Sequence, residues 1–386
     1  MKLKLQHVGP IAEADLTFGD LTVLVGPQAS GKSIALQMLK LVLDTASVQD
    51  IMKRYGLDWS GAVPEFFDAY FGEGMRGIWN DRRSTVSWEG RAVDMSRRAR
   101  GRRGPKRESL FYIPAQRVLA LRDGWPRPFL DYSPGVPFVV CDFGENLRLL
   151  VEKELGASKE LFPQERRLTR DFREMLDRSV FKGFRLRMDK VRPRRRLVLG
   201  ATQESLPFMV WSAGQREFVP LLLGLYWLMP PGQAARRRAI DWVVLEELEM
   251  GLHPRAITVV LLMVFGLVAR GYRVCISTHS PQVLEAVWAL RQVQASRAPA
   301  PTRALLRVFD APYTPKMRKI ARIVLRKNVQ VYYFDGATGR ARDISSLDLD
   351  DEESGGGGWG GLTEFSGRAN AVVADAAANA DGEGQA

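Results

Sequence analysis

The 386-residue chain has few cysteines, only three histidines and no long hydrophobic run. Its longest apolar helical stretch, residues 257–269, is too short to span a bilayer. The first residues, Met1–Leu5, are strand-like and lack the apolar core of a signal peptide. No heptad pattern continues for three or four repeats, which argues against a long coiled coil. We therefore expect a soluble, cytoplasmic protein without a membrane partner.

The two cysteines, Cys141 and Cys275, lie far apart, each in an apolar run that we expect to be a strand. Such positions favour buried free thiols in a reducing compartment, although the sequence leaves a disulfide between them open. Acidic residues are also in deficit, since 44 Asp and Glu face 56 Lys and Arg. The net charge of +12 favours an acidic partner, with nucleic acid first.

The most informative stretch is residues 23–33, in which Gly26, four further residues and Gly31-Lys32-Ser33 fit the phosphate-loop pattern. A strand-like run precedes it and a helix-like run follows. Glycines permit a tight turn whose N–H groups converge on phosphate, and the helix start adds positive potential. We expect Lys32 to reach the β- and γ-phosphates of ATP and Ser33 to hold Mg²⁺. The ATP-binding residues would be Gly26, Pro27, Gln28, Ala29, Ser30, Gly31, Lys32 and Ser33; the alternative is an ordinary glycine-rich turn.

Two later strand ends carry side chains that suit hydrolysis. The apolar run at 243–245 ends in Glu246, which would lie by magnesium, and Glu247, which would polarise the attacking water. The run at 274–276 leads to His279, which could hydrogen-bond a γ-phosphate oxygen. Each has an ordinary alternative, namely an exposed acidic turn and a structural histidine.

A third segment, Ser212-Ala213-Gly214-Gln215, opens an apolar helix predicted at 214–229. Ser212 can cap this helix, and its first N–H groups could receive a γ-phosphate. A plain serine cap is the alternative. The strand, helix, strand order across residues 242–277 predicts a parallel sheet covered by helices.

Arginines cluster at residues 97–107 and 192–196, where apolar periodicity is absent. We weigh two interpretations equally for the first cluster, contact with a nucleic-acid backbone and a solvated basic loop. Beyond about residue 350 the composition turns to Asp, Glu, Gly and Ala, so a flexible tail is expected at 351–386.

The succession of these motifs resembles the ABC-type ATPases and, within them, the AAA-class ATPases of the overcoming-lysogenization-defect (OLD) group. Residues 246–254 resemble that group's Asp-Glu-Pro-Glu-x-x-Leu-His-Pro strand end, 277–281 its switch histidine, and 212–215 the ABC signature. Residues 112–117 resemble a segment in which a glutamine, here Gln116, approaches magnesium. The resemblance covers about residues 1–45, 109–118 and 205–345.

The resemblance implies an α/β P-loop NTPase: one ABC-type ATPase head over residues 1–350, with a mixed or parallel sheet and an inserted helical, basic region at about 47–205. It implies ATP and Mg²⁺ as cofactors. Two heads would sandwich ATP in a homodimer or higher oligomer, and hydrolysis would release them. The residues concerned would be Glu247 and His279 as catalytic groups, Ser33, Glu246 and Gln116 at the metal, and Ser212, Gly214 and Gln215 facing the partner's γ-phosphate.

Two departures from the family pattern bear on function. Glu246 stands where Asp is usual and Leu248 where Pro is usual. The longer side chain at the metal position would shift the water shell there, which leaves slow hydrolysis or ATP binding alone open as alternatives to full turnover. The TOPRIM nuclease domain of OLD nucleases has no counterpart, because Asp348-x-Asp350 is an isolated acidic pair. We therefore expect an ATPase switch coupled to nucleic acid and to a separate effector, as in phage defence. The alternative is a RecF-like repair ATPase that binds DNA directly; a transporter subunit fits poorly because it needs no arginine-rich insertion.

Overall fold

The computed structural model describes residues 1–101, 107–133, 135–158, 160–189, 195–201, 204–231, 236–296 and 299–346, together with 369, 372 and 373. Parts of both predicted arginine clusters, the Asp348-x-Asp350 pair and nearly all of the predicted tail lie outside these residues. Within the described ranges, no helix is long and apolar enough to cross a membrane.

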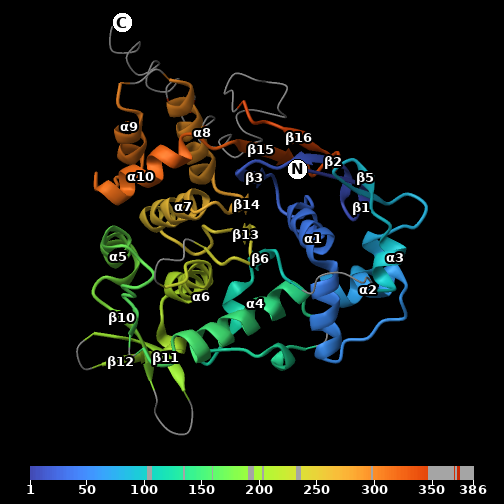
Figure 1. Cartoon of the computed structure of the whole chain (residues 1–386), viewed down its shortest axis with the longest axis horizontal. Helices are drawn as coiled ribbons and strands as arrows, with labels where there is room; N and C mark the ends of the chain where they lie inside the picture. Colours follow the sequence, from blue (N-terminus) through green and yellow to red (C-terminus); the bar gives the residue numbers. More distant parts are fainter. Residues whose placement is uncertain are drawn as a thin grey trace, which may run out of the picture.

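A six-stranded sheet passes through the middle of the molecule in the order β16-β15-β3-β14-β13-β6 (Figure 1). Every neighbouring pair is parallel except β15 and β16. This confirms the predicted α/β fold with a mixed, mainly parallel sheet. The strands are β3 (Leu21–Val25), β6 (Leu110–Ile113), β13 (Trp242–Glu246), β14 (Arg273–Thr278), β15 (Val329–Phe334) and β16 (Ala341–Asp343).

Helices cover both faces of this sheet, so its strands are buried on both sides. In β13, Val243 and Leu245 face a core formed with α6, α7, α8 and α10, whereas Val244 faces a second core formed with α1, α2 and part of α4. The helices are α1 (Lys32–Arg54), α2 (Val63–Phe71), α4 (Phe138–Leu149), α6 (Ala213–Leu228), α7 (Pro254–Ala269), α8 (Pro281–Ala295) and α10 (Pro315–Val324).

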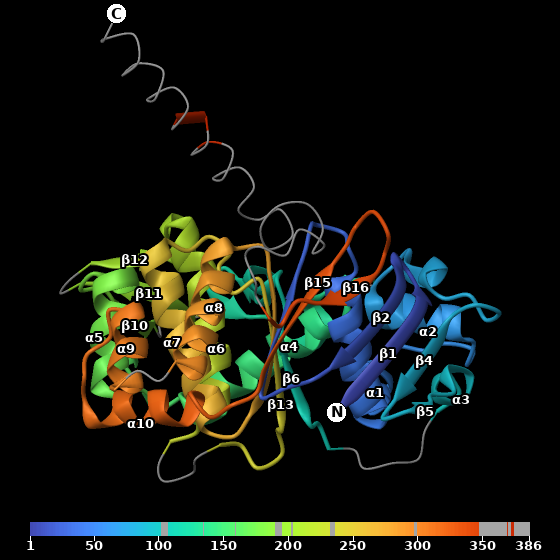
Figure 2. The same cartoon turned by 90° about the horizontal axis from the view of Figure 1, so that it is seen from above.

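A separate antiparallel sheet, β2-β1-β4-β5, lies beside α1 and α2 at the opposite side of the molecule from α9 and α10 (Figures 1 and 2). Its first hairpin places Ile11 against the phosphate loop. The elements are β1 (Lys2–Val8), β2 (Ile11–Thr17), β4 (Thr85–Trp88) and β5 (Arg91–Ala92), with the short helix α3 (Met95–Ala99) following.

The region predicted as a helical insertion, residues 47–205, contains helices and strands alike. It supplies β4, β5 and β6, a short hairpin and three strands of a further antiparallel sheet, β12-β11-β10-β9. On β10, the alternating apolar residues Leu186 and Met188 are buried in the core that contains α6, α7, α8 and α10. This alternation explains why a strand forms there. The remaining elements are β7 (Leu121–Arg122), β8 (Trp125–Pro126), β9 (Glu160–Phe162), α5 (Arg170–Leu176), β10 (Arg185–Asp189), β11 (Arg196–Gly200) and β12 (Ser205–Pro207).

Both cysteines are buried free thiols, so no disulfide joins them. Cys275 lies on β14, as predicted for a strand. Cys141 lies on helix α4, and the strand expectation there is wrong. The consecutive residues 138–141 form one helical turn that is buried in the second core. This packing overrides the strand preference of valine.

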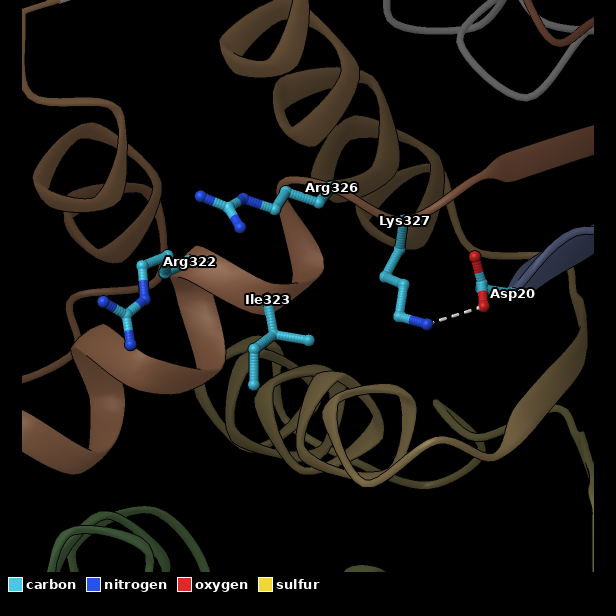
Figure 3. A pocket seen from close by; sticks show the side chains of 5 residues that line it. All are labelled: Asp20, Arg322, Ile323, Arg326 and Lys327. Carbon is cyan, nitrogen blue, oxygen red and sulfur yellow. Dashed lines mark hydrogen bonds and ion pairs between the residues drawn. The ribbon is translucent and has the colours of Figure 1, made fainter.

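Helices α8, α9 (Pro301–Val308) and α10 form a block inserted between β14 and β15. An open hollow of roughly 510 Å³ lies beside α10, lined by Arg322, Ile323, Arg326 and Lys327 with Asp20 from the sheet side (Figure 3). Lys327 Nζ pairs with Asp20 Oδ1 at 2.8 Å.

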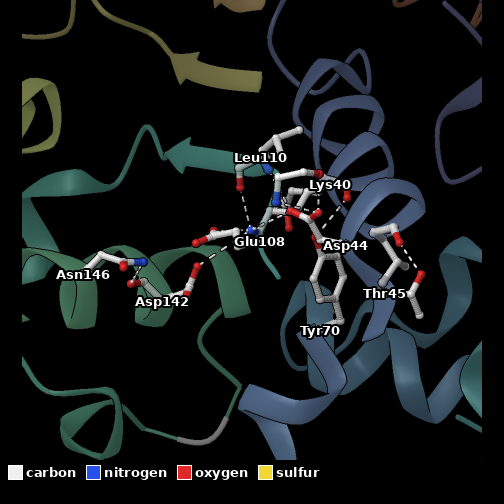
Figure 4. Close-up of polar contacts among 11 residues, drawn as sticks. Lys40, Asp44, Thr45, Tyr70, Glu108, Leu110, Asp142 and Asn146 are labelled. Atoms are coloured by element: carbon white, nitrogen blue, oxygen red, sulfur yellow. Dashed lines mark hydrogen bonds and ion pairs between the residues drawn. The ribbon is translucent and has the colours of Figure 1, made fainter. Parts of the chain in front are cut away.

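A buried charge network joins α1 to the chain before β6 and to α4 (Figure 4). Lys40 Nζ lies 2.6 Å from Glu108, 3.5 Å from Asp44 and 3.9 Å from Asp142. Burial and the neighbouring carboxylates raise the pKa of Asp142 to about 8. The Asp44 carboxylate accepts from Ser109 and Leu110 where α1 departs from helical geometry. The phosphate-loop helix is therefore fixed to the sheet by ionic contacts as well as apolar packing.

Candidate functional site

The phosphate loop, residues 26–33, joins β3 to α1 and depends on two glycines. Gly26 has φ 141° and Gly31 has φ 98°. A Cβ at Gly26 would lie 2.2 Å from the Phe334 carbonyl oxygen, and one at Gly31 would lie 2.5 Å from Ile11 Cγ1. Any side chain would therefore push the loop away from the sheet, so the glycine pattern is a steric requirement of this curvature.

Lys32 folds back over this loop and is only 5% exposed. Its Nζ donates to the carbonyl oxygens of Gly26 (2.8 Å) and Pro27 (2.7 Å). Burial lowers the pKa of Lys32 to about 8, and the nearby carboxylates of Glu247, Glu246 and Glu249 oppose this shift. The end of β13 is therefore electrostatically coupled to the phosphate loop.

Glu246 closes β13 and is 2% exposed. Its Oε2 accepts from the Ala115 N–H at 3.2 Å, while Oε1 has no hydrogen-bond partner among the described residues. Burial raises the pKa of Glu246, whereas the Ser33 hydroxyl, the Ala115 N–H and the Tyr112 phenol lower it. A buried carboxylate oxygen left unsatisfied beside a serine hydroxyl fits Mg²⁺.

The described residues contain no group of three or more His, Cys, Asp or Glu side chains arranged to hold a metal ion unaided. Mg²⁺ commonly takes one or two protein oxygens and completes its shell with water and substrate phosphates. Ser33 and Glu246 could therefore hold Mg²⁺ together with the phosphates of a nucleotide.

Glu247 and His279 lie next to each other at neighbouring strand ends. His279 Nε2 is 3.3 Å from Glu247 Oε1, and both side chains are part-exposed. Glu247 has φ 44°, and its N–H donates to the Ser277 carbonyl oxygen at 2.9 Å. This left-handed turn directs the Glu247 carboxylate toward His279 while Glu246 stays buried. A water-activating base and a phosphate-sensing imidazole could act together here.

Glu249 and Arg117 support this pair, and the sequence analysis assigned a role to neither. Glu249 Oε1 accepts from Thr278 Oγ1 (2.7 Å) and from the His279 N–H (2.9 Å), which fixes the histidine backbone. Arg117 is 0% exposed and donates from Nη1 to the carbonyl oxygens of Glu246 and Glu247, each at 3.1 Å. The sequence signals were a third carboxylate in the 246–249 run and an arginine at the end of the Gln116 motif.

Among the described residues, the predicted side chains of Gln116, Ser212 and Gln215 form no hydrogen bond to Lys32, Glu246, Glu247 or His279. Gln116 is exposed, next to Ala115. Ser212 and Gln215 form a capping box at the start of α6, with Gln215 N–H to Ser212 Oγ at 3.2 Å and Ser212 N–H to Gln215 Oε1 at 3.1 Å. Gly214 sits close to Gly251, whose carbonyl oxygen would be 2.9 Å from an added Cβ. Within the described part of the chain, no hydrogen bond joins Ser212 or Gln215 to the phosphate loop.

A family model matches part of the chain. Residues 154–285 match a family described as "AAA domain, putative AbiEii toxin, Type IV TA system". The family match supports an ABC-like AAA ATPase. It covers about a third of the chain, includes the predicted signature, the acidic strand end and His279, and does not single out the OLD group.

No curated protein has a significantly similar sequence. Among solved structures, one of an SMC head bound to the C-winged helix domain of ScpA is 13% identical (TM-score 0.42), covering 74% of this chain and 90% of that one. The SMC head domain from Thermotoga maritima is 15% identical (TM-score 0.30) with the same coverages. An SMC head domain with an extended coiled coil, bound to the C-terminal domain of ScpA derived from Pyrococcus furiosus, is 11% identical (TM-score 0.40), covering 89% and 95%.

Proposed function

We propose that the chain binds and hydrolyses ATP and works as a nucleotide-driven switch. The observation that carries the proposal is the convergence of Lys32, the Glu246–Glu247 pair and His279, which come from three different strand ends. They meet at the carboxyl edge of a parallel sheet, where α/β proteins place their ligands.

The side chains present would divide the work as follows. Lys32 and the loop N–H groups bind the β- and γ-phosphates, and Ser33 with Glu246 holds Mg²⁺, which neutralises charge on the phosphate oxygens. Glu247 orients a water and accepts its proton as the water oxygen bonds to the γ-phosphorus. The bond between that phosphorus and the β–γ bridging oxygen breaks, giving ADP and inorganic phosphate. His279 donates from Nε2 and senses whether the γ-phosphate is there.

We infer that a second copy completes this site through Ser212, Gly214 and Gln215. The start of α6 is exposed, and the N–H groups of Ala213 and Gly214, which take no part in its capping box, are positioned to meet a partner's γ-phosphate. Met209 and Val210, just before it, are 68% and 60% exposed. Large apolar side chains in such a position favour burial against another chain. ATP would then hold two heads together, and hydrolysis would release them.

We also propose that this switch serves a separate effector and contacts nucleic acid, as in an OLD-like phage-defence ATPase. The +12 charge supports an acidic partner, and the matching family is itself described in terms of a toxin–antitoxin system.

Two substitutions test the ATPase. Lys32→Ala should abolish nucleotide binding and turnover. Glu247→Gln should keep ATP binding but lower kcat by about 10²–10⁴-fold, because the base is lost, and should accumulate an ATP-bound dimer. Glu285→Gln, an exposed carboxylate on α8, is the matched control. Wild-type turnover in Glu247→Gln, or a strict monomer at high concentration with ATP, would contradict the proposal.

A further inference from the structure

The surface formed by α9, α10 and the loop between them carries an unusual concentration of positive charge. Residues 301–327 contain eight Lys and Arg and a single acidic residue, Asp310. Their net charge of +7 is more than half of the chain's +12. This segment lies outside both arginine clusters that the sequence analysis selected, and it is fully described by the structure.

The cations of α10 are arranged on one face. Met317, Ala321 and Val324 are buried against the core, so the opposite face is left to solvent. Arg318 and Arg322 follow each other one turn apart on that face, and Arg326 comes just beyond the last turn. All three are exposed. Over the described residues, no acidic side chain forms an ion pair with any of them.

The hollow beside α10 shows that this charge is available to a ligand. Lys327 turns toward Asp20 and is neutralised by it at 2.8 Å, whereas Arg322 and Arg326 extend away from the helix (Figure 3). Asp20, the one acidic residue that lines the hollow in the described part of the chain, is therefore already paired. Two free guanidinium groups one turn apart suit two phosphates of one backbone, since guanidinium binds phosphate through paired N–H donors.

An aromatic side chain stands at the other end of the same face. Tyr313, two residues before α10, is 44% exposed. The guanidinium groups of Arg303 and Arg318 lie 4.8 Å and 5.2 Å from its ring centroid. An exposed ring with two arginines beside it, at the end of a row of cations, combines a platform for an unpaired base with contacts for the backbone that carries it.

We propose that the α9–α10 surface, defined by Arg303, Tyr313, Arg318, Arg322 and Arg326, binds single-stranded nucleic acid. The cations hold the phosphates and Tyr313 stacks on a base. This inference rests on the proposed function and deepens it. It names single-stranded nucleic acid as the partner and the α9–α10 surface as its binding site. An acidic protein would use the charges but would have no need of Tyr313.

The test measures binding of a labelled single-stranded oligonucleotide to the full-length protein, with DNA and RNA versions as separate arms. The triple reversal Arg318→Glu/Arg322→Glu/Arg326→Glu should weaken binding by more than about tenfold and lower the salt slope by about 2, as expected for three lost phosphate contacts. A matched control, Arg82→Glu/Arg83→Glu/Arg91→Glu, changes the net charge equally at exposed positions near β4 and β5. It should bind almost as the wild type does.

The stacking role has its own pair of variants. Tyr313→Ala should weaken binding about 5- to 100-fold, while Tyr313→Phe should retain it. Equal losses in the triple reversal and its control would overturn the site assignment, since only net charge would then matter. Displacement of the oligonucleotide by polyglutamate as effective as by unlabelled oligonucleotide, or unchanged binding in Tyr313→Ala, would overturn the nucleic-acid assignment.

The measurement separates this inference from the ATPase proposal. Lys32→Ala should lose nucleotide binding yet still bind the oligonucleotide in the absence of ATP. Conversely, the triple reversal should keep the wild-type affinity for ATP, which also shows that it is folded. If the triple reversal kept both its ATP affinity and full oligonucleotide binding, the α9–α10 surface assignment would be wrong and the ATPase proposal would stand.

Discussion

The ammonium group of Lys32 is held by backbone carbonyl oxygens in a largely dry position, which makes its charge sensitive to alkaline pH. Its pKa falls from 10.5 to about 8 because burial disfavours the charged form. Phosphate binding requires that charge. Above pH 8 the protein must therefore take up a proton whenever it binds a nucleotide.

We predict that affinity for a non-hydrolysable ATP analogue falls as pH rises through about 8, by up to tenfold per pH unit. The sign follows from the lowered pKa, since the charged form dominates below pH 8 and is lost above it. Calorimetric titration in buffers of different ionisation enthalpy would show proton uptake. Lys32→Arg, which stays charged, should give a flat profile; a flat profile for the wild type would contradict the prediction.

Single residues were predictable where the backbone conformation allows one residue type only. Gly26 and Gly31 could be recognised from the pattern because no other residue permits their backbone. Arg117 and Glu249 could not, because their roles depend on tertiary contacts with the Glu246 carbonyl oxygen and the His279 N–H. Sequence spacing contains no direct signal for such contacts.

Among the elements, α1 is fixed by a buried network in which one lysine faces three carboxylates. Burial, together with the charges of Glu108 and Asp44 that Lys40 does not fully offset, raises the pKa of Asp142 to about 8. The folded protein then keeps a proton on Asp142 that the unfolded chain releases near pH 3.8. Between these values the folded state binds more protons, and its stability falls as pH rises.

We predict that Asp142→Asn stabilises the protein by roughly 1–4 kcal/mol at pH 8 and has little effect at pH 4. Thermal or urea unfolding at the two pH values would measure this. Asp58→Asn, at an exposed position, is the control. A stabilisation of the same size at both pH values would mean that the effect comes from packing and not from the charge of Asp142.

The buried elements of the main sheet and its helices were predictable from hydrophobic runs bounded by polar residues. The helix predicted at 214–229 runs from Ala213 to Leu228, one residue earlier at each end. The pairing partners of the strands within residues 47–205 were harder to predict. Strand β6 pairs with β13, a partner about 130 residues away along the chain, and local periodicity cannot reveal that pairing.

For the molecule as a whole, the proposed signature and the phosphate loop lie on different parts of one chain. If two chains exchange them, defects in the two motifs should complement each other. Lys32→Ala removes phosphate binding, and Ser212→Glu puts a negative charge where the partner's γ-phosphate would sit, while the helix N-terminus tolerates that charge.

We predict that each variant alone is inactive in phosphate release and that an equimolar mixture recovers measurable activity, because a mixed dimer holds one intact composite site. Mixing Lys32→Ala with the double variant Lys32→Ala/Ser212→Glu should recover none. Full activity of Ser212→Glu alone would show that the site is complete within one chain.

Glu247 occupies a left-handed backbone position, φ 44°, that the Arg117 and Ser277 contacts hold in place. Such a position disfavours any residue with a side chain, and glycine would relieve a strain of about 1 kcal/mol. Glu247→Gly would therefore make the protein more resistant to heat but would remove its water-activating base. A screen for thermostability alone would favour variants that have lost turnover, so that activity survives only where it is itself under selection.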